Sequence, residues 1–140
     1  MKQLLLAILL CWNTLALAEV DVQVDHAWVR EAPPGARMMA AYMTLINRGE
    51  EDITLVDVNS PAFRMVMLHK SAMVDGMARM SHVDKLDIPA GASVALEPGS
   101  YHLMMPAPDT RLVSGDKVEF ILEFADESQL RVEAEVRKAP

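Results

Sequence analysis

The chain is built from short apolar or alternating segments, each of which ends at turn-forming residues. Between residues 53 and 58 apolar and polar side chains alternate, as they do on a strand with one buried face. Segments such as Pro33-Pro34-Gly35 and Asn59-Ser60-Pro61 interrupt the pattern. No segment has the length and the 3.6-residue apolar period of an amphipathic helix. The segments with strand character, of which we expect eight or nine to form strands, are 20–30, 38–46, 53–58, 64–73, 77–83, 86–89, 92–96, 101–104, 118–124 and 130–136.

The first 18 of the 140 residues have the pattern of a secretory signal peptide. Lys2 supplies a positive start, an apolar run follows at 4–12, and Ala16-Leu17-Ala18 fits the signal-peptidase pattern. Because Leu10 precedes Cys11 where a lipoprotein signal would carry a small residue, we expect ordinary cleavage before Glu19. Residues 19–140 then form one domain without a membrane span. So many short strands in one domain predict an all-β Greek-key sandwich or barrel.

Composition limits the chemistry of the exported domain. Cleavage removes the only cysteine, so neither a disulfide nor a thiolate ligand remains. The formal net charge is −7 for the whole chain, and such acidity disfavours nucleic acid and anionic membranes as partners. Methionine is abundant, with 11 residues in the chain, many of them in the segment 65–105. A soft-metal site in this domain would have to use thioether and imidazole groups.

Asp75-Gly76 lies between two strand-like segments and matches a two-residue type I′ hairpin turn. Counting back from this turn places Ser71 opposite Met80. His69 shares a face with Ser71, so His69 and Met80 become diagonal neighbours about 7–8 Å apart at the backbone. We therefore expect one imidazole and one thioether to lie side by side on this hairpin.

His102-Leu103-Met104 offers the same pair of groups again. Residues i and i+2 of a strand point to one face, so His102 and Met104 lie together while Leu103 points to the other side. If this strand lies near the hairpin, His69, Met80, His102 and Met104 form a site with two nitrogens and two sulfurs. Neutral, soft thioethers select Cu(I) over Zn²⁺, Ca²⁺ or Mg²⁺, and the missing cysteine argues against a blue-copper electron-transfer centre.

The remaining histidines and methionines have ordinary interpretations. A lone histidine in a β domain is usually structural or exposed, which is how we interpret His26 and His82. A lone methionine usually fills a core, and four are assigned to it: Met38, Met39, Met43 and Met105. Met67 and Met73 share the face of His69 and either assist the metal or pack nearby.

At these residues the chain resembles the PCu(A)C family of periplasmic copper chaperones. The family pattern H-x10-M-x21-H-x-M matches His69, Met80, His102 and Met104 without a gap. Similarity extends to Ala27-Trp28-Val29-Arg30 and covers nearly the whole domain. The resemblance implies a cupredoxin-like β-barrel with an exposed Cu(I) site.

The resemblance also implies a role and partners. These are copper delivery toward the Cu(A) centre of cytochrome c oxidase, with a Sco-type protein or the oxidase Cu(A) subunit as acceptor. Some relatives carry a His/Met-rich C-terminal extension; this chain ends at Lys138-Ala139-Pro140, so we expect one copper site. We further expect a periplasmic, monomeric protein that is not an enzyme, since no catalytic triad, carboxylate pair or phosphate loop is recognisable.

Two other functions remain open from the sequence. A copper-resistance or storage protein would use the same four ligands. A structural sandwich module would explain the fold and the signal peptide, but not the aligned histidines and methionines. Convergence of the four side chains in space separates a metal site from a purely structural module.

Overall fold

The computed structural model describes residues 20–140, so the expected signal peptide at 1–18 lies outside the described residues. Within this range the chain forms strands without any helix. The strands are β1 (Val22–Arg30), β2 (Met38–Asn47), β3 (Ile53–Asn59), β4 (Met67–Val74), β5 (Met77–His82), β6 (Leu86–Ile88), β7 (Ser93–Leu96), β8 (Tyr101–Pro106), β9 (Lys117–Phe124) and β10 (Gln129–Arg137). The prediction of an all-β domain is confirmed. The count of ten exceeds the eight or nine expected, because the short segments β6 and β7 also pair as strands.

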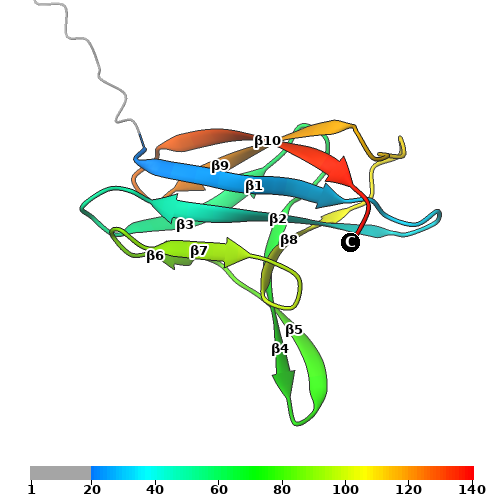
Figure 1. Ribbon diagram of the computed structural model, residues 1–140, viewed down its shortest axis with the longest axis horizontal. Helices are drawn as coiled ribbons and strands as arrows, with labels where there is room; N and C mark the ends of the chain where they lie inside the picture. The colour runs from blue at the N-terminus through cyan, green and yellow to red at the C-terminus, as the bar shows by residue number, and fades with distance from the viewer. Residues whose placement is uncertain (1–19) are drawn as a thin grey trace, which may run out of the picture.

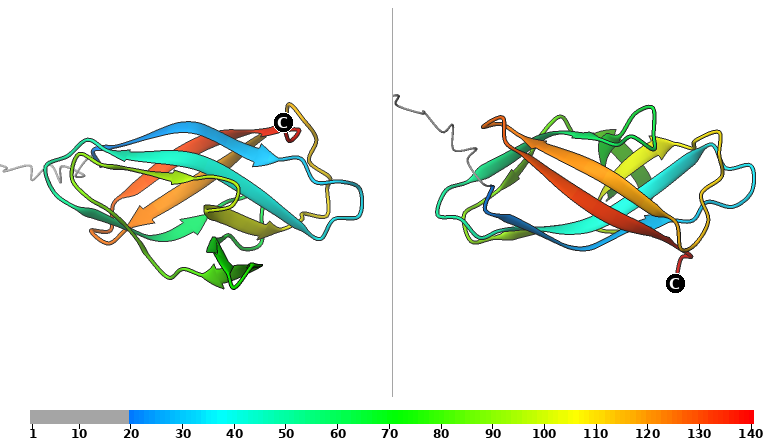
Figure 2. Two further views of the ribbon diagram at one scale, coloured as in Figure 1. Left: turned by 60° about the horizontal axis from the view of Figure 1, so that its bottom comes forward. Right: turned by 90° about the horizontal axis from the view of Figure 1, so that it is seen from above.

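All ten strands belong to one mixed sheet in the order β5-β4-β8-β7-β2-β1-β10-β9-β3-β6. Most neighbours are antiparallel, whereas β1 pairs with β10 and β7 with β8 in parallel. The sheet curls into a flattened, barrel-like body, as Figures 1 and 2 show. This is the architecture expected of a cupredoxin-like Greek-key sandwich or barrel.

The inner surface of the curled sheet holds one apolar core. Phe120, Leu122 and Phe124 alternate inward along β9, and Leu45 and Leu103 reach the same core from β2 and β8. Three of the four methionines assigned to the core, Met39, Met43 and Met105, are buried there. The assignment of Met38 was wrong: its position on β2 has the opposite parity to Met39, so its side chain is 39% exposed.

The β4–β5 hairpin projects from the body (Figure 1), because only the first half of β4 is paired with β8. Beyond Ser71, whose backbone amide donates to the Ser100 carbonyl, the hairpin pairs with no further strand of the described residues, and its outer part is exposed on both faces. Lys70 Nζ lies 4.8 Å from the ring centre of Tyr101, a cation–π contact that ties the base of the hairpin to β8. The base of the hairpin is therefore held by its pairing with β8 and by this contact, while its outer part projects into the solvent.

Candidate metal centre

The hairpin turn sets the register on which the site depends. Asp75 and Gly76 both have positive φ, 51° and 73°, as a type I′ turn requires. The pairing is Val74 with Met77 and Ser71 with Met80, so the register predicted from the sequence is confirmed. The turn thereby fixes which side chains of β5 meet those of β4.

His69 and Met80 are in contact across this hairpin. The Nδ1 atom of His69 lies 3.3 Å from the Sδ atom of Met80. A nitrogen and a sulfur that share one metal ion at bond lengths of about 2.0 and 2.3 Å stand about 3.5 Å apart in tetrahedral geometry. The pair already has the separation that a shared ion needs.

His102 comes to the same place from β8, directly opposite His69 in the β4–β8 pairing. The two ring centres are 5.9 Å apart and the rings meet edge to face. His102 Nδ1 lies 3.1 Å from the Ser100 carbonyl oxygen, which can only accept, so Nδ1 carries the proton and donates. In the neutral ring the lone pair is then on Nε2, and this buried atom has no hydrogen-bond partner among residues 20–140.

Met104 follows His102 by two residues and faces Met67 across the β4–β8 pairing. It is half-buried, whereas Leu103 between the two is fully buried in the core, as the alternation predicts. The side chains of His69, Met80 and His102 thus lie against one another, and Met104 lies two residues further along the same face of β8. Met67 lies beside Met104 on the neighbouring strand β4. Met73 lies toward the hairpin tip, and its side chain is 69% exposed.

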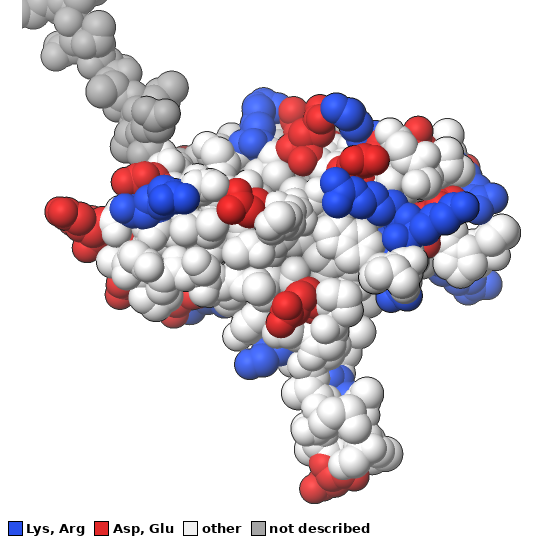
Figure 3. All heavy atoms as spheres, viewed as in Figure 1, with Lys and Arg blue, Asp and Glu red and all other residues white. Residues whose placement is uncertain are grey.

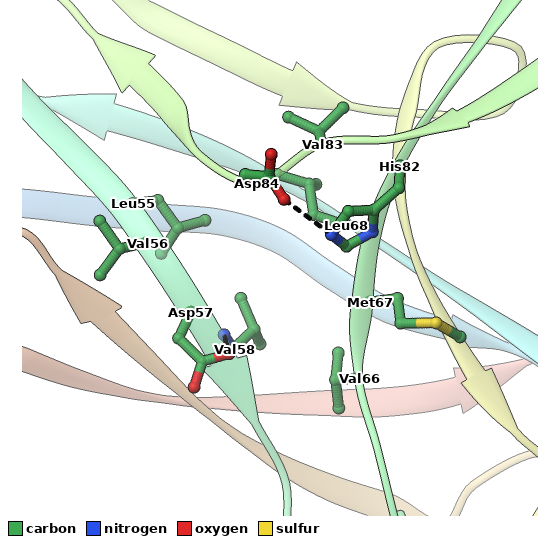
Figure 4. A pocket seen from close by; sticks show the side chains of 10 residues that line it. All are labelled: Leu55, Val56, Asp57, Val58, Val66, Met67, Leu68, His82, Val83 and Asp84. Carbon is green, nitrogen blue, oxygen red and sulfur yellow. Dashed lines mark hydrogen bonds and ion pairs between the residues drawn. The ribbon is translucent and has the colours of Figure 1, made fainter.

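His82 is the residue that the sequence interpretation undervalued. It is exposed, as expected, but it lies directly opposite His69 in the hairpin, with ring centres 5.7 Å apart. Its Nε2 atom is 3.3 Å from Asp84 Oδ1 (Figure 4), at the edge of a hollow that Met67 and Leu68 also line. The signal was present in the sequence, because the register counted from the Asp75-Gly76 turn also pairs residue 69 with residue 82. His26, by contrast, is exposed at an irregularity of β1, away from this group.

The electrostatic setting favours a neutral imidazole at the centre of the group. Burial lowers the pKa of His69, and the neighbouring imidazoles of His102 and His82 lower it further. The neutral ring is the form that binds a metal ion. Figure 3 shows the projecting hairpin as largely uncharged, with acidic atoms at its tip.

A metal centre here with three or more protein ligands would need the methionines. Within residues 20–140, no three side chains of the types His, Cys, Asp and Glu converge closely enough to hold an ion by themselves. The same residues contain no helix long and apolar enough to cross a membrane. The geometry therefore offers imidazole nitrogens together with a thioether, at a place accessible from the solvent.

Comparisons with known proteins identify the family of the chain. Residues 22–136 match the family described as "Putative lipoprotein LpqE-like". A putative lipoprotein of Leifsonia xyli subsp. xyli is 32% identical over 117 residues, which cover 83% of this chain and 69% of that protein.

Two solved structures have a similar fold. The solution structure of CuI-DR1885 from Deinococcus radiodurans is 35% identical, with a TM-score of 0.67, over 82% of this chain and 76% of that chain. The copper-bound PCuAC domain from PmoF2 is 22% identical, with a TM-score of 0.68, over 86% of this chain and 94% of that domain. The second similarity concerns the fold alone.

Proposed function

The chain belongs to the family of LpqE-like, PCuAC-type domains, and from this premise we propose that it binds one Cu(I) ion and passes it to another protein. The proposed ligands are His69, Met80, His102 and Met104. The relative described as CuI-DR1885 supports this choice of metal.

One observation carries the proposal: in the part of the chain that the structure describes, the buried Nε2 atom of His102 has no hydrogen-bond partner. An unsatisfied buried acceptor costs about 1–3 kcal/mol, so a protein rarely retains one without a use for it. The Ser100 carbonyl fixes the proton on Nδ1, the arrangement by which proteins orient histidines that bind metal ions. A bound ion would complete the coordination of this nitrogen.

The donor set favours the monovalent ion. Thioether sulfur is soft and uncharged, and it binds Cu(I) in preference to harder divalent cations. All four proposed ligands are neutral, so they compensate little of a second positive charge. The exposure of Met80, 50%, supports a site from which copper can leave.

Transfer would proceed by exchange of ligands. A donor atom of the acceptor protein, such as a cysteine sulfur or a histidine nitrogen, attacks the ion from the exposed hairpin side. Met80 leaves first because it is the most exposed of the four and its sulfur is a weak ligand. The copper remains bound to at least two ligands throughout, which avoids release of the free ion.

The wider role follows the resemblance. We propose that the protein is exported by a cleavable signal peptide, acts in the periplasm as a monomer and has no enzymatic activity. Its acceptor would be a Sco-type protein or the Cu(A) subunit of cytochrome c oxidase. Loss of oxidase activity in a deletion strain under copper limitation, with recovery on added copper, would distinguish delivery from storage.

The ligand assignment is tested by anaerobic Cu(I) titration against a chromophoric Cu(I) chelator. The wild-type protein should withdraw one equivalent of copper. The double variant Met80→Leu, Met104→Leu keeps the side-chain volume but loses both sulfurs, and its affinity should fall at least a hundredfold. Met77→Leu, an exposed methionine next to the turn that points to the opposite face of β5 from Met80, is the matched control. Unchanged affinity in the double variant would rule out the assignment.

A further inference from the structure

Three imidazoles lie in a row at the base of the hairpin. His69 is in the middle, with His102 of β8 on one side and His82 of β5 on the other, at ring-centre distances of 5.9 and 5.7 Å. The proposed Cu(I) site uses two of them, and nothing in that site requires His82. The imidazole of His82 is nevertheless paired with a residue outside that site, Asp84.

Asp84 orients His82. Its Oδ1 atom lies 3.3 Å from His82 Nε2, and a carboxylate at this distance favours the tautomer that has its proton on Nε2. The lone pair of His82 is then on Nδ1. A nearby carboxylate also offsets part of the charge of a cation bound there. Both side chains are accessible, with exposed fractions of 57% for His82 and 94% for Asp84.

The spacing of His69 and His82 suits a shared metal ion. Two imidazoles bound to one ion at about 2.0 Å have ring centres about 4.5–6 Å apart when the angle at the metal is between about 90° and 140°. The measured 5.7 Å falls in this range. Direct opposition on paired strands also means that the two side chains leave the backbone on the same face.

We propose that His69 and His82 form a second metal site that overlaps the first and takes Cu(II). Two imidazoles with water in the open positions form a nitrogen and oxygen donor set, for which Cu(II) has the highest affinity among the divalent first-row ions. Asp84 acts as the positioning residue of His82. This inference deepens the proposed copper-binding function and shares His69 with it.

The shared histidine makes the two sites mutually exclusive. A neutral imidazole has one lone pair, so His69 binds either the Cu(I) held with Met80 and His102 or the Cu(II) held with His82. A monovalent soft ion and Cu(II) therefore compete for the protein. The hairpin offers a soft donor set and a harder one on the two sides of a single histidine.

The test is a Cu(II) titration without reductant, followed by electron paramagnetic resonance and by competition with glycine. The wild-type protein should bind one equivalent with a signal showing coupling to imidazole nitrogens. His82→Asn should weaken Cu(II) binding at least tenfold, and Asp84→Asn should weaken it about threefold. His26→Asn, which removes an exposed histidine elsewhere, should leave it unchanged. Cu(II) affinity that is the same in His82→Asn and in the wild type would overturn the proposal.

Two further measurements separate this inference from the proposed Cu(I) function. Preloading the protein with Ag(I), a redox-inert substitute for Cu(I), should suppress the Cu(II) signal, and simultaneous binding of both ions would contradict the shared histidine. Cu(I) affinity in His82→Asn should stay within about threefold of the wild type, and this result also shows that the variant is folded. The Met80→Leu, Met104→Leu variant should lose Cu(I) but retain Cu(II). Loss of Cu(II) binding in that variant would contradict two separate donor sets.

Discussion

At the scale of single residues, the protein keeps a buried histidine that is poorly satisfied. His102 is 5% exposed, and one of its two ring nitrogens, Nε2, has no hydrogen-bond partner within the described residues. The other ring nitrogen, Nδ1, donates to the Ser100 carbonyl, which also accepts from the Ser71 backbone amide. Removing the imidazole therefore leaves no backbone acceptor unpaired. We therefore expect His102 to matter more for the proposed copper binding than for folding.

This imbalance predicts the behaviour of His102→Leu. A leucine of similar size removes the unsatisfied nitrogen, so the metal-free variant should be as stable as the wild type or more stable by up to about 2 kcal/mol. Its Cu(I) affinity should fall at least tenfold. Urea unfolding monitored by circular dichroism and the chelator titration measure the two effects. A loss of more than about 1 kcal/mol in the metal-free variant would show that the histidine is structural.

The four proposed ligands could be selected from the sequence, because the i, i+2 spacing of His102 and Met104 and the hairpin turn are local signals. The importance of His82 could also have been recognised, since the same register pairs it with His69. The exposure of Met38 was missed because an apolar segment at the start of a strand does not reveal which parity faces the core.

At the scale of elements, the hairpin turn determines which side chains meet. Asp75 and Gly76 both occupy the left-handed region, which Asp and Gly tolerate better than most residues. A Cβ added to Gly76 would have no neighbour within 4 Å, so a substitution there acts through the backbone conformation and not through a clash. The turn can thus be tested separately from packing.

Gly76→Val should weaken the hairpin by about 1–2 kcal/mol, because a β-branched residue is strained at positive φ. The protein should stay folded, but Met80 should lose its fixed position and Cu(I) affinity should fall about threefold to tenfold. Amide hydrogen exchange of β4 and β5 together with the chelator titration measures this. Asp75→Asn, which tolerates the same conformation, is the control and should change neither quantity.

The pairing of β4 with β8 could not be derived from local signals. His69 and His102 are far apart in the chain, and their meeting depends on how the whole sheet is ordered. For this reason, the sequence predicts that the two His-Met pairs converge only if the strand of His102 lies near the hairpin. The family resemblance supplied the expectation that the segments are neighbours.

At the scale of the whole molecule, the core and the candidate site are separate. The core lies inside the curled sheet, and the hairpin projects outside it (Figure 1). Leu68 and Leu103 connect the core to the candidate site, because both pack in the core while their neighbours in the strand face the site. These neighbours are His69 on β4 and His102 and Met104 on β8. Changes deep in the body should therefore alter stability without altering copper affinity.

Leu122→Ala tests this separation. Leu122 is fully buried on β9, and its truncation should lower the free energy of unfolding by about 2–5 kcal/mol. The Cu(I) affinity of the folded protein should change by less than about twofold. Urea unfolding and chelator competition at a temperature well below the transition provide both values. A large loss of affinity would show that the site depends on the core directly.

Copper should in turn stabilise the folded state. An ion that binds only the folded protein adds about 2.7 kcal/mol at a free concentration one hundred times its dissociation constant. Anaerobic thermal unfolding of the wild type should therefore shift upward with Cu(I). The Met80→Leu, Met104→Leu variant should show no shift at the same concentration, and an equal shift in both proteins would place the ion elsewhere.

The central claim is that imidazole nitrogens and thioether sulfurs of these four residues hold Cu(I). X-ray absorption at the copper edge of the anaerobically loaded protein tests it most directly. We predict an edge typical of Cu(I) and a ligand shell of nitrogen and sulfur in about equal numbers, with the sulfur contribution lost in the Met80→Leu, Met104→Leu variant. A wild-type shell containing only nitrogen and oxygen would contradict the account.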